Sequence, residues 1–146
     1  MHGTLLSKFY PGLLSAICLL AILWLTLAPR PVPVTADMFI PYADKVAHFL
    51  MFGGLMLCLV IDRDLWYQRR YEQTGRLPRC RNMVLVLVLG AVAVALTGAL
   101  TEVLQDLMDS GRGGDTFDFL ADVAGTVVAA LVSPHLSVLL LHRKSR

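Results

Sequence analysis

The sequence predicts an all-α membrane protein in which four transmembrane helices form one compact bundle, with both termini in the cytoplasm. The first observation is composition, since 56% of the 146 residues are apolar and only 16% are charged. Average soluble domains contain about 45–50% apolar and about 25% charged residues. The second observation is that the apolar residues gather in four long runs. The third is that basic and acidic residues separate to opposite ends of these runs. The low share of charged residues argues against a soluble monomer.

Each of the four runs is long enough to cross a bilayer once its flanks are included. A bilayer core about 30 Å thick needs roughly 20 helical residues, within a range of about 17–25. Lipid also requires that backbone polar groups are bonded within the segment, which favours helices. The predicted helices are residues 12–28, 44–61, 83–107 and 117–141. We expect them to form a single domain that covers residues 1–146.

The first run resembles a secretory signal peptide, because Lys8 precedes an uncharged stretch at residues 12–28. Its candidate cleavage site at residues 26–28 is followed by Pro29, which is a poor residue to cut before. Three further spans follow in the chain. We therefore expect an uncleaved first helix that ends at this proline.

The other three runs differ in the polar residues that they contain. The second contains a histidine, His48, and the third has no charged residue from position 83 to position 100. The fourth contains Asp122 and His135 as its ionisable residues between positions 119 and 141. Pro134 lies near the end of the fourth run, where we expect it to kink the helix or to end it early.

The basic residues predict the orientation in the membrane. Ten of the 13 Lys and Arg residues fall on the side that holds both termini and the central loop 62–82, namely Lys8, Arg63, Arg69, Arg70, Arg76, Arg79, Arg81, Arg143, Lys144 and Arg146. The positive-inside rule places this side in the cytoplasm. We interpret the basic loop as an anchor near anionic lipid headgroups. Eight of the 11 acidic residues fall on the opposite, outer side.

Polar residues at the outer ends of three helices follow helical spacing. Asp44 and His48 are four residues apart at the start of the second helix, so they share a face. Glu102 and Gln105 are three residues apart near the end of the third helix. Asp115, Asp118, Asp122 and Gly125 form one stripe on the fourth helix. Because all three faces lie at the same depth, the bundle is expected to bring them together. Ionisable residues within spans are candidates for function.

If this cluster is an enzyme site, His48 is the expected general acid or base, oriented by Asp44. Glu102 or Asp118 would be the second catalytic carboxylate. Arg112 and Lys45 would bind a phosphate or carboxylate of the substrate. The other expected substrate-binding residues are Gln105, Asp115 and Asp122.

Other roles for these residues remain open. A hard cation such as Mg²⁺ or Ca²⁺ on Asp115, Asp118 and Glu102 is conceivable, although no metal ligand is assigned from the sequence. The two aspartates are also suited to capping the fourth helix. His48 is equally suited to hydrogen-bonded packing, and Arg112 to a structural role between carboxylates.

Three sequence blocks resemble the VanZ-like family of integral membrane proteins. They are Asp44-Lys45-x-x-His48-Phe49-x-x-Phe52-Gly53, Thr101-Glu102-x-x-Gln105 and Arg112-x-x-Asp115-x-x-Asp118-x-x-x-Asp122-x-x-Gly125. The family pattern has the same blocks in the same order, and the likeness covers about residues 10–140. Two positions depart from it, because the family usually has Asn where this chain has Asp122 and often has Gly where it has Ala129.

The resemblance implies a protein of the bacterial inner membrane whose namesake is linked to resistance to glycopeptide antibiotics, teicoplanin in particular. It does not imply a defined reaction or a cofactor. The expected partners are membrane lipid and a lipid-linked or cell-wall substrate at the outer face. A nucleic-acid partner is not expected, and the sequence does not indicate the oligomeric state.

Three classes of function are compatible with these observations. The first is an envelope enzyme, and the second is a non-catalytic protein whose polar cluster binds a ligand or a partner, or is purely structural. The third is transport or proton relay, which we rank lowest because the inner halves of the spans are almost free of polar residues.

Overall fold

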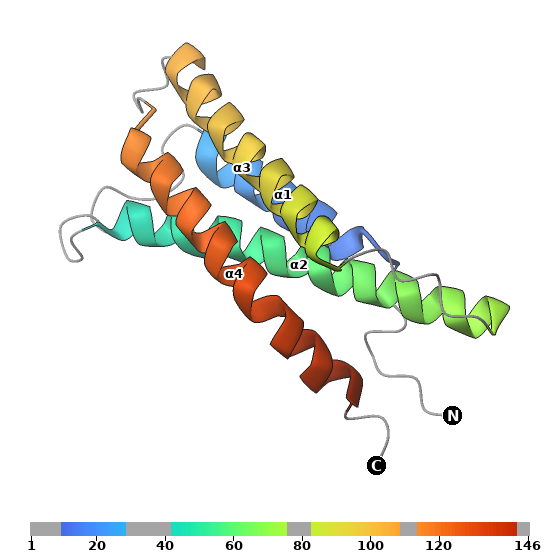
Figure 1. Ribbon diagram of the computed structural model, residues 1–146. Helices are drawn as coiled ribbons and strands as arrows, with labels where there is room; N and C mark the ends of the chain where they lie inside the picture. The colour runs from blue at the N-terminus through green and yellow to red at the C-terminus, as the bar shows by residue number, and fades with distance from the viewer. Residues whose placement is uncertain (1–9, 29–41, 76–82, 109–113, 143–146) are drawn as a thin grey trace.

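Four helices make up the fold of the computed structural model, and their order follows the four apolar runs (Figure 1). They are α1 (Leu13–Leu27), α2 (Ala43–Thr74), α3 (Met83–Met108) and α4 (Thr116–His142). The structure describes residues 10–28, 42–75, 83–108 and 114–142, and side chains as far as residue 136. No strand occurs among the described residues, so the prediction of an all-α fold with four helices is confirmed.

Several residues singled out in the sequence lie outside the described part of the chain. Arg112 is one of them, and Pro29 is another. Basic residues that predict the orientation also lie there, namely Lys8, Arg76, Arg79, Arg81, Arg143, Lys144 and Arg146.

Three of the four helices are long and apolar enough to cross a membrane. They are Ala43–Thr74, Met83–Met108 and the part of α4 from Thr116 to Leu136. The helix α1 is apolar but has only 15 residues, which corresponds to about 22 Å at 1.5 Å per residue. Large apolar side chains are exposed along these helices, most densely on α3, where Val84, Leu89 and Leu96 are examples. Such a surface is expected to face lipid.

The helix α2 is longer than the sequence predicts, because it continues past position 61 to Thr74. It ends at Gly75, whose positive φ of 65° and N–H bond to the Tyr71 carbonyl are typical of a helix C-terminus. Arg63 stacks on the Tyr67 ring and Arg70 on the Trp66 ring, so local contacts support the extra turns. The expectation that residues 62–74 belong to a loop is therefore wrong, since charged residues end an apolar run without ending a helix.

The helix α4 runs through Pro134 and continues to His142, so the proline does not end it early. The bounds of α3 and α4 otherwise agree with the predicted ones to within one residue at each end.

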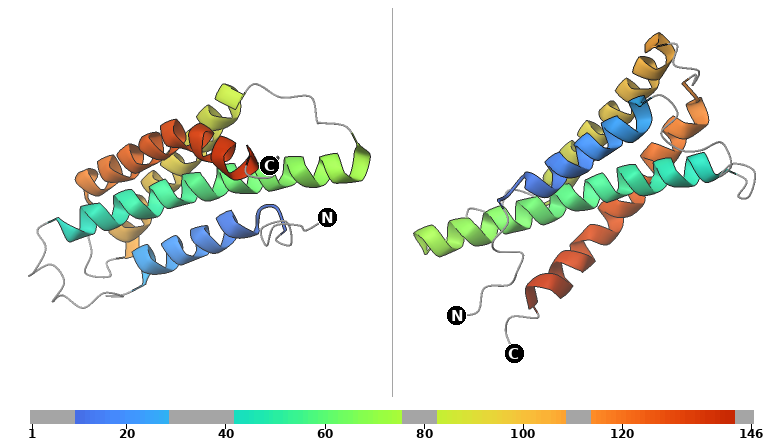
Figure 2. Two further views of the ribbon diagram at one scale, coloured as in Figure 1. Left: turned by 90° about the horizontal axis from the view of Figure 1, so that it is seen from below. Right: turned by 180° about the vertical axis from the view of Figure 1, so that it is seen from behind.

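The helix α2 contacts each of the other three helices, most extensively α4. Two views show that α1 and α3 begin, and α2 and α4 end, toward the same end of the bundle (Figure 2). The buried apolar core consists of Ile22, Phe52, Leu55, Met56, Val60, Val94 and Ala129. Close to the opposite end, where α2 and α4 begin and α3 ends, the buried residues become polar.

Candidate functional site: a buried histidine between two carboxylates

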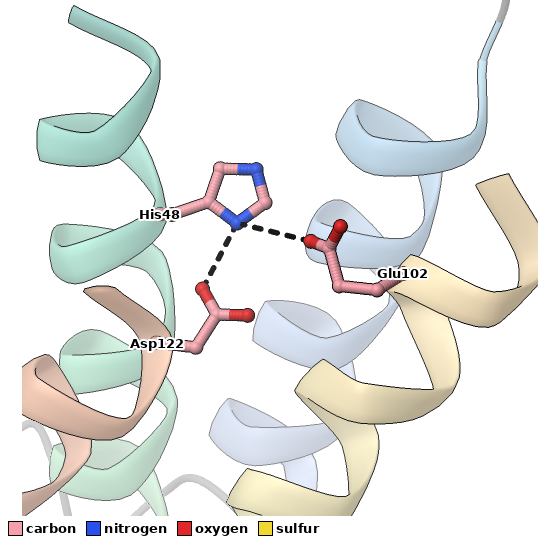
Figure 3. Close-up of side chains that lie close together, drawn as sticks. All are labelled: His48, Glu102 and Asp122. Carbon is pink, nitrogen blue, oxygen red and sulfur yellow. Dashed lines mark hydrogen bonds and ion pairs between the residues drawn. The ribbon is translucent and has the colours of Figure 1, made fainter. Parts of the chain in front are cut away.

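His48 lies one turn into α2 and is almost completely buried. Its Nδ1 is 2.9 Å from Oδ1 of Asp122, which is fully buried on α4 (Figure 3). Its ring stacks on that of Phe52, one turn further along α2, with 6.3 Å between the ring centroids. The partner of His48 is therefore Asp122 on another helix and not Asp44 on its own helix, as the sequence suggested.

A close crossing of α2 and α4 brings His48 and Asp122 together. The two helices approach so closely at Gly125 that a Cβ built there would lie 2.1 Å from the Phe49 carbonyl oxygen. A Cβ at Gly53 would lie 3.1 Å from the Gly125 carbonyl oxygen. Asp122 precedes Gly125 by about one turn and His48 is the residue before Phe49, so the close approach at Gly125 constrains the distance between the paired side chains.

Glu102 extends from α3 toward the same histidine (Figure 3). Its Oε1 is 3.9 Å from Nδ1 of His48, and its Oε2 accepts a hydrogen bond of 2.7 Å from the Asp115 backbone N–H. One oxygen thus ties α3 to the residue before α4, while Oε1 is buried and has no hydrogen-bond partner in the described residues. We call His48, Glu102 and Asp122 the buried cluster.

The second oxygen of Asp122 lies against the backbone of α3. A Cβ at Gly98 would be 2.7 Å from Oδ2, so only glycine leaves room for this carboxylate. Oδ2 is buried and has no hydrogen-bond partner among the described residues. The buried cluster therefore contains two unpaired carboxylate oxygens from two different helices.

A second set of charged residues lies beside the buried cluster, nearer to solvent. The ammonium group of Lys45 is 3.0 Å from Asp44, 2.8 Å from Asp115 and 2.9 Å from Asp118. We call these four residues the Lys45 cluster. Hydrogen bonds from Lys45, and then from the Phe117 N–H, hold the pKa of the Asp115 carboxyl below its usual value. Asp118 links the two clusters, because its Oδ2 is 3.9 Å from Nε2 of His48.

Gln105 makes its hydrogen bond outside both clusters. Its side-chain amide is buried and donates a 2.8 Å hydrogen bond to the Thr26 carbonyl at the end of α1. It thereby joins α3 to α1. Of the site residues expected from the sequence, the structure brings together His48, Glu102, Asp122, Asp118, Asp115, Lys45 and Asp44.

The sequence did not predict that one further acid is buried and contacts another helix. Asp62, expected in the cytoplasmic loop, is buried on α2 and accepts hydrogen bonds from the Ser15 N–H (2.8 Å) and hydroxyl (2.6 Å) on α1. It follows His48 by 14 residues, a spacing that returns to nearly the same helical face. This spacing could have indicated that Asp62 faces the bundle, as His48 does.

Two groups of side chains have an arrangement that can hold a metal ion. One is the buried cluster, in which one ligand atom from each residue lies within 4.8 Å of the others. The other consists of Asp44, Asp115 and Asp118. The Lys45 ammonium already supplies positive charge to these three carboxylates, so the hard cation considered for Asp115 and Asp118 would have to displace it.

The fold and the site define the class of protein: a helical bundle with three helices apolar enough to cross a membrane and a buried histidine–carboxylate cluster. Comparison with protein-family models, with curated proteins and with solved structures found no significant match.

Proposed function

We propose that this chain is a VanZ-like protein of the bacterial inner membrane that spans the bilayer four times, with both termini in the cytoplasm. The support is the resemblance of three sequence blocks, the four apolar runs and the distribution of basic residues. The 15 residues of α1 are few for a span, and local thinning of the bilayer would accommodate them at modest cost. In this orientation the buried cluster lies near the outer face.

The proposed function is to bind or act on a cell-wall or lipid-linked substrate at that face, with His48 as general acid or base. The contact of 2.9 Å between His48 and Asp122 carries this proposal, because it fixes the ring by its Nδ1 side. Nε2 faces Asp118, at the border with the Lys45 cluster, and is free to exchange a proton. Glu102 is the second carboxylate within reach.

The charge of the outer end indicates which part of a substrate it would accept. Lys45 is surrounded by three carboxylates, so an anionic group would have to compete with them. Cationic and hydrogen-bonding groups fit this acidic surface better. The proposed substrate contact is therefore an amine, amide or hydroxyl rather than a phosphate on Lys45.

A purely structural cluster is the second candidate. It is favoured by the bond of Glu102 to the Asp115 N–H and of Gln105 to the Thr26 carbonyl, since both contacts join helices. In that case the polar residues would stabilise the bundle without contacting a substrate.

The first prediction separates these two functions. In a teicoplanin-susceptible bacterial host that expresses the chain, we expect a raised inhibitory concentration of teicoplanin. His48→Ala and Glu102→Gln should abolish the increase, because loss of a general acid or base costs about 10²–10⁴ in rate. Asp62→Asn is the matched control, since it changes a buried carboxylate outside the cluster.

The readouts are the inhibitory concentration and the amount of folded protein in the membrane fraction. Loss of resistance at unchanged protein levels supports an active site. Loss of folded protein in both variants supports the structural role, and an unchanged inhibitory concentration with the wild-type chain contradicts a part in resistance.

A further inference from the structure

The two unpaired oxygens of the buried cluster require a partner. Within the described part of the chain, Glu102 Oε1 and Asp122 Oδ2 are buried without a hydrogen bond, and His48 supplies the ionisable nitrogen beside them. A buried carboxylate without a compensating charge or hydrogen bond is costly, most of all within a membrane span. Two ionised carboxylates carry more negative charge than one imidazole can neutralise, so a further positive charge would be favourable there.

The geometry of the cluster matches a metal site with three protein ligands. Nδ1 of His48 is 2.9 Å from Asp122 Oδ1 and 3.9 Å from Glu102 Oε1 (Figure 3). Ligand atoms around a tetrahedral zinc ion with bonds of about 2.0–2.2 Å lie about 3.4 Å apart. Shifts of about half an ångström would bring these two distances to that value, and the third pair of ligand atoms, the two carboxylate oxygens, lies within 4.8 Å.

The surroundings also orient the ligands as they do in known metal sites. Glu102 is held through its other oxygen by the Asp115 N–H, which leaves Oε1 directed at the cluster. Nε2 of His48 is 3.9 Å from Oδ2 of Asp118, so a closer approach of this carboxylate would give the carboxylate–histidine–metal arrangement. Both supports come from residues at the start of α4.

We propose that His48 Nδ1, Glu102 Oε1 and a carboxylate oxygen of Asp122 bind one divalent transition-metal ion, with zinc as the best fit. One nitrogen and two oxygens favour such an ion over Mg²⁺ or Ca²⁺, which prefer oxygen ligands alone. The ion takes the place of the proton between His48 and Asp122. A fourth position remains for water or a substrate group, as in catalytic zinc sites. The inference rests on the proposed function for the position of the cluster at the outer face, and it revises the role of His48, which with the ion bound is a ligand while metal-bound water would supply the acid–base group.

The second prediction tests this site with zinc as the probe. The full chain is purified in detergent, treated with a chelator and titrated with ZnCl₂ by calorimetry. We expect one zinc ion per chain and X-ray absorption distances of about 2.0–2.2 Å to nitrogen and oxygen ligands. Asp122→Asn and Glu102→Gln should weaken binding more than about 100-fold, because even outer-shell changes cost about 10–100-fold.

Asp62→Asn is the control, because it alters a buried carboxylate on α2 that lies outside the cluster. It should keep zinc affinity within about threefold of the wild type, because distant sites that share no partners act nearly independently. Asp122→Asn preserves the shape of the side chain, so its thermal unfolding without zinc shows whether it folds. No binding by the wild type, or binding that persists in both cluster variants, would overturn the site.

The result is separable from the proposed function. Stoichiometric zinc binding together with full activity of Glu102→Gln in the teicoplanin assay would retain the metal site and reject the active site. Absence of zinc binding together with loss of resistance in that variant would reject the metal site and retain the active site.

Discussion

At the end of the bundle where α2 and α4 begin, one ammonium group lies among three carboxylates. Lys45 contacts Asp44, Asp115 and Asp118 within 3.0 Å, and these acids come from α2 and from the start of α4. Side chains of Lys45 and Asp115 remain partly exposed, so solvent screens the contact. Its main effect is therefore on ionisation and orientation of the acids rather than on overall stability.

The third prediction concerns the ionisation of Asp115. Its pKa in the fold lies below the ordinary value of 3.8, chiefly because Lys45 donates a hydrogen bond to it. The stabilisation is therefore present above the unfolded-state pKa and is lost as the pH falls through the lower folded-state pKa. In the Lys45→Met variant, the titration midpoint of the Asp115 carboxyl, followed by carbon NMR in micelles, should rise.

Lys45→Arg is the matched control, because it retains a positive charge at the same position and should retain a low midpoint. A midpoint that is equal in the wild type and in Lys45→Met would show that Lys45 does not determine the ionisation of Asp115.

Among the helices, the crossing of α2 and α4 decides whether the buried cluster forms. The backbone of Gly125 touches Phe49 on α2, which is the residue after His48, and Asp122 precedes Gly125 by three residues on α4. A side chain at Gly125 would therefore disturb the site by pushing α2 and α4 apart, and not by contacting the histidine.

The fourth prediction compares two glycine substitutions. Gly125→Ala places a Cβ 2.1 Å from the Phe49 carbonyl oxygen, so the helices must separate, and we expect a loss of about 1–3 kcal/mol in the free energy of unfolding. Gly54→Ala meets nothing within 4 Å and should be neutral or stabilising by up to about 1 kcal/mol, because alanine favours helix.

Thermal or denaturant unfolding in detergent measures both variants. Equal stability of Gly125→Ala and Gly54→Ala would contradict the close crossing.

For the whole molecule, the four helices place different residues at the two ends of the bundle. The helices α1 and α3 begin, and α2 and α4 end, toward one end of the bundle. Arg63, Arg69 and Arg70 lie on the last turns of α2 near that end. The buried and Lys45 clusters lie toward the other end, so a single orientation decides the position of both.

The fifth prediction is made for two exposed positions in a variant whose native cysteines are replaced. A thiol reagent that does not cross membranes should label Phe117→Cys, at the start of α4, in cells with an accessible inner membrane. Glu72→Cys, near the end of α2, should react only after the membrane is opened. The opposite labelling pattern would invert the proposed orientation.

The sequence by itself determined that four helices form and where α3 and α4 lie, because long apolar runs without strand alternation leave few other structures. It also indicated that His48, Glu102 and Asp118 come together, since helical spacing places each on a defined face. It did not reveal that α2 continues to Thr74, because hydropathy reports where a segment is apolar and not where a helix ends.

Only the tertiary structure decided which partner each polar residue has. His48 contacts Asp122 instead of Asp44, and Gln105 bonds to Thr26 of α1. These pairings depend on the rotation and separation of whole helices, and backbone contact at Gly125 constrains the separation of α2 and α4. Periodicity along one helix contains no information about that separation, and for this reason the unpaired oxygens of the buried cluster became visible only in the folded bundle.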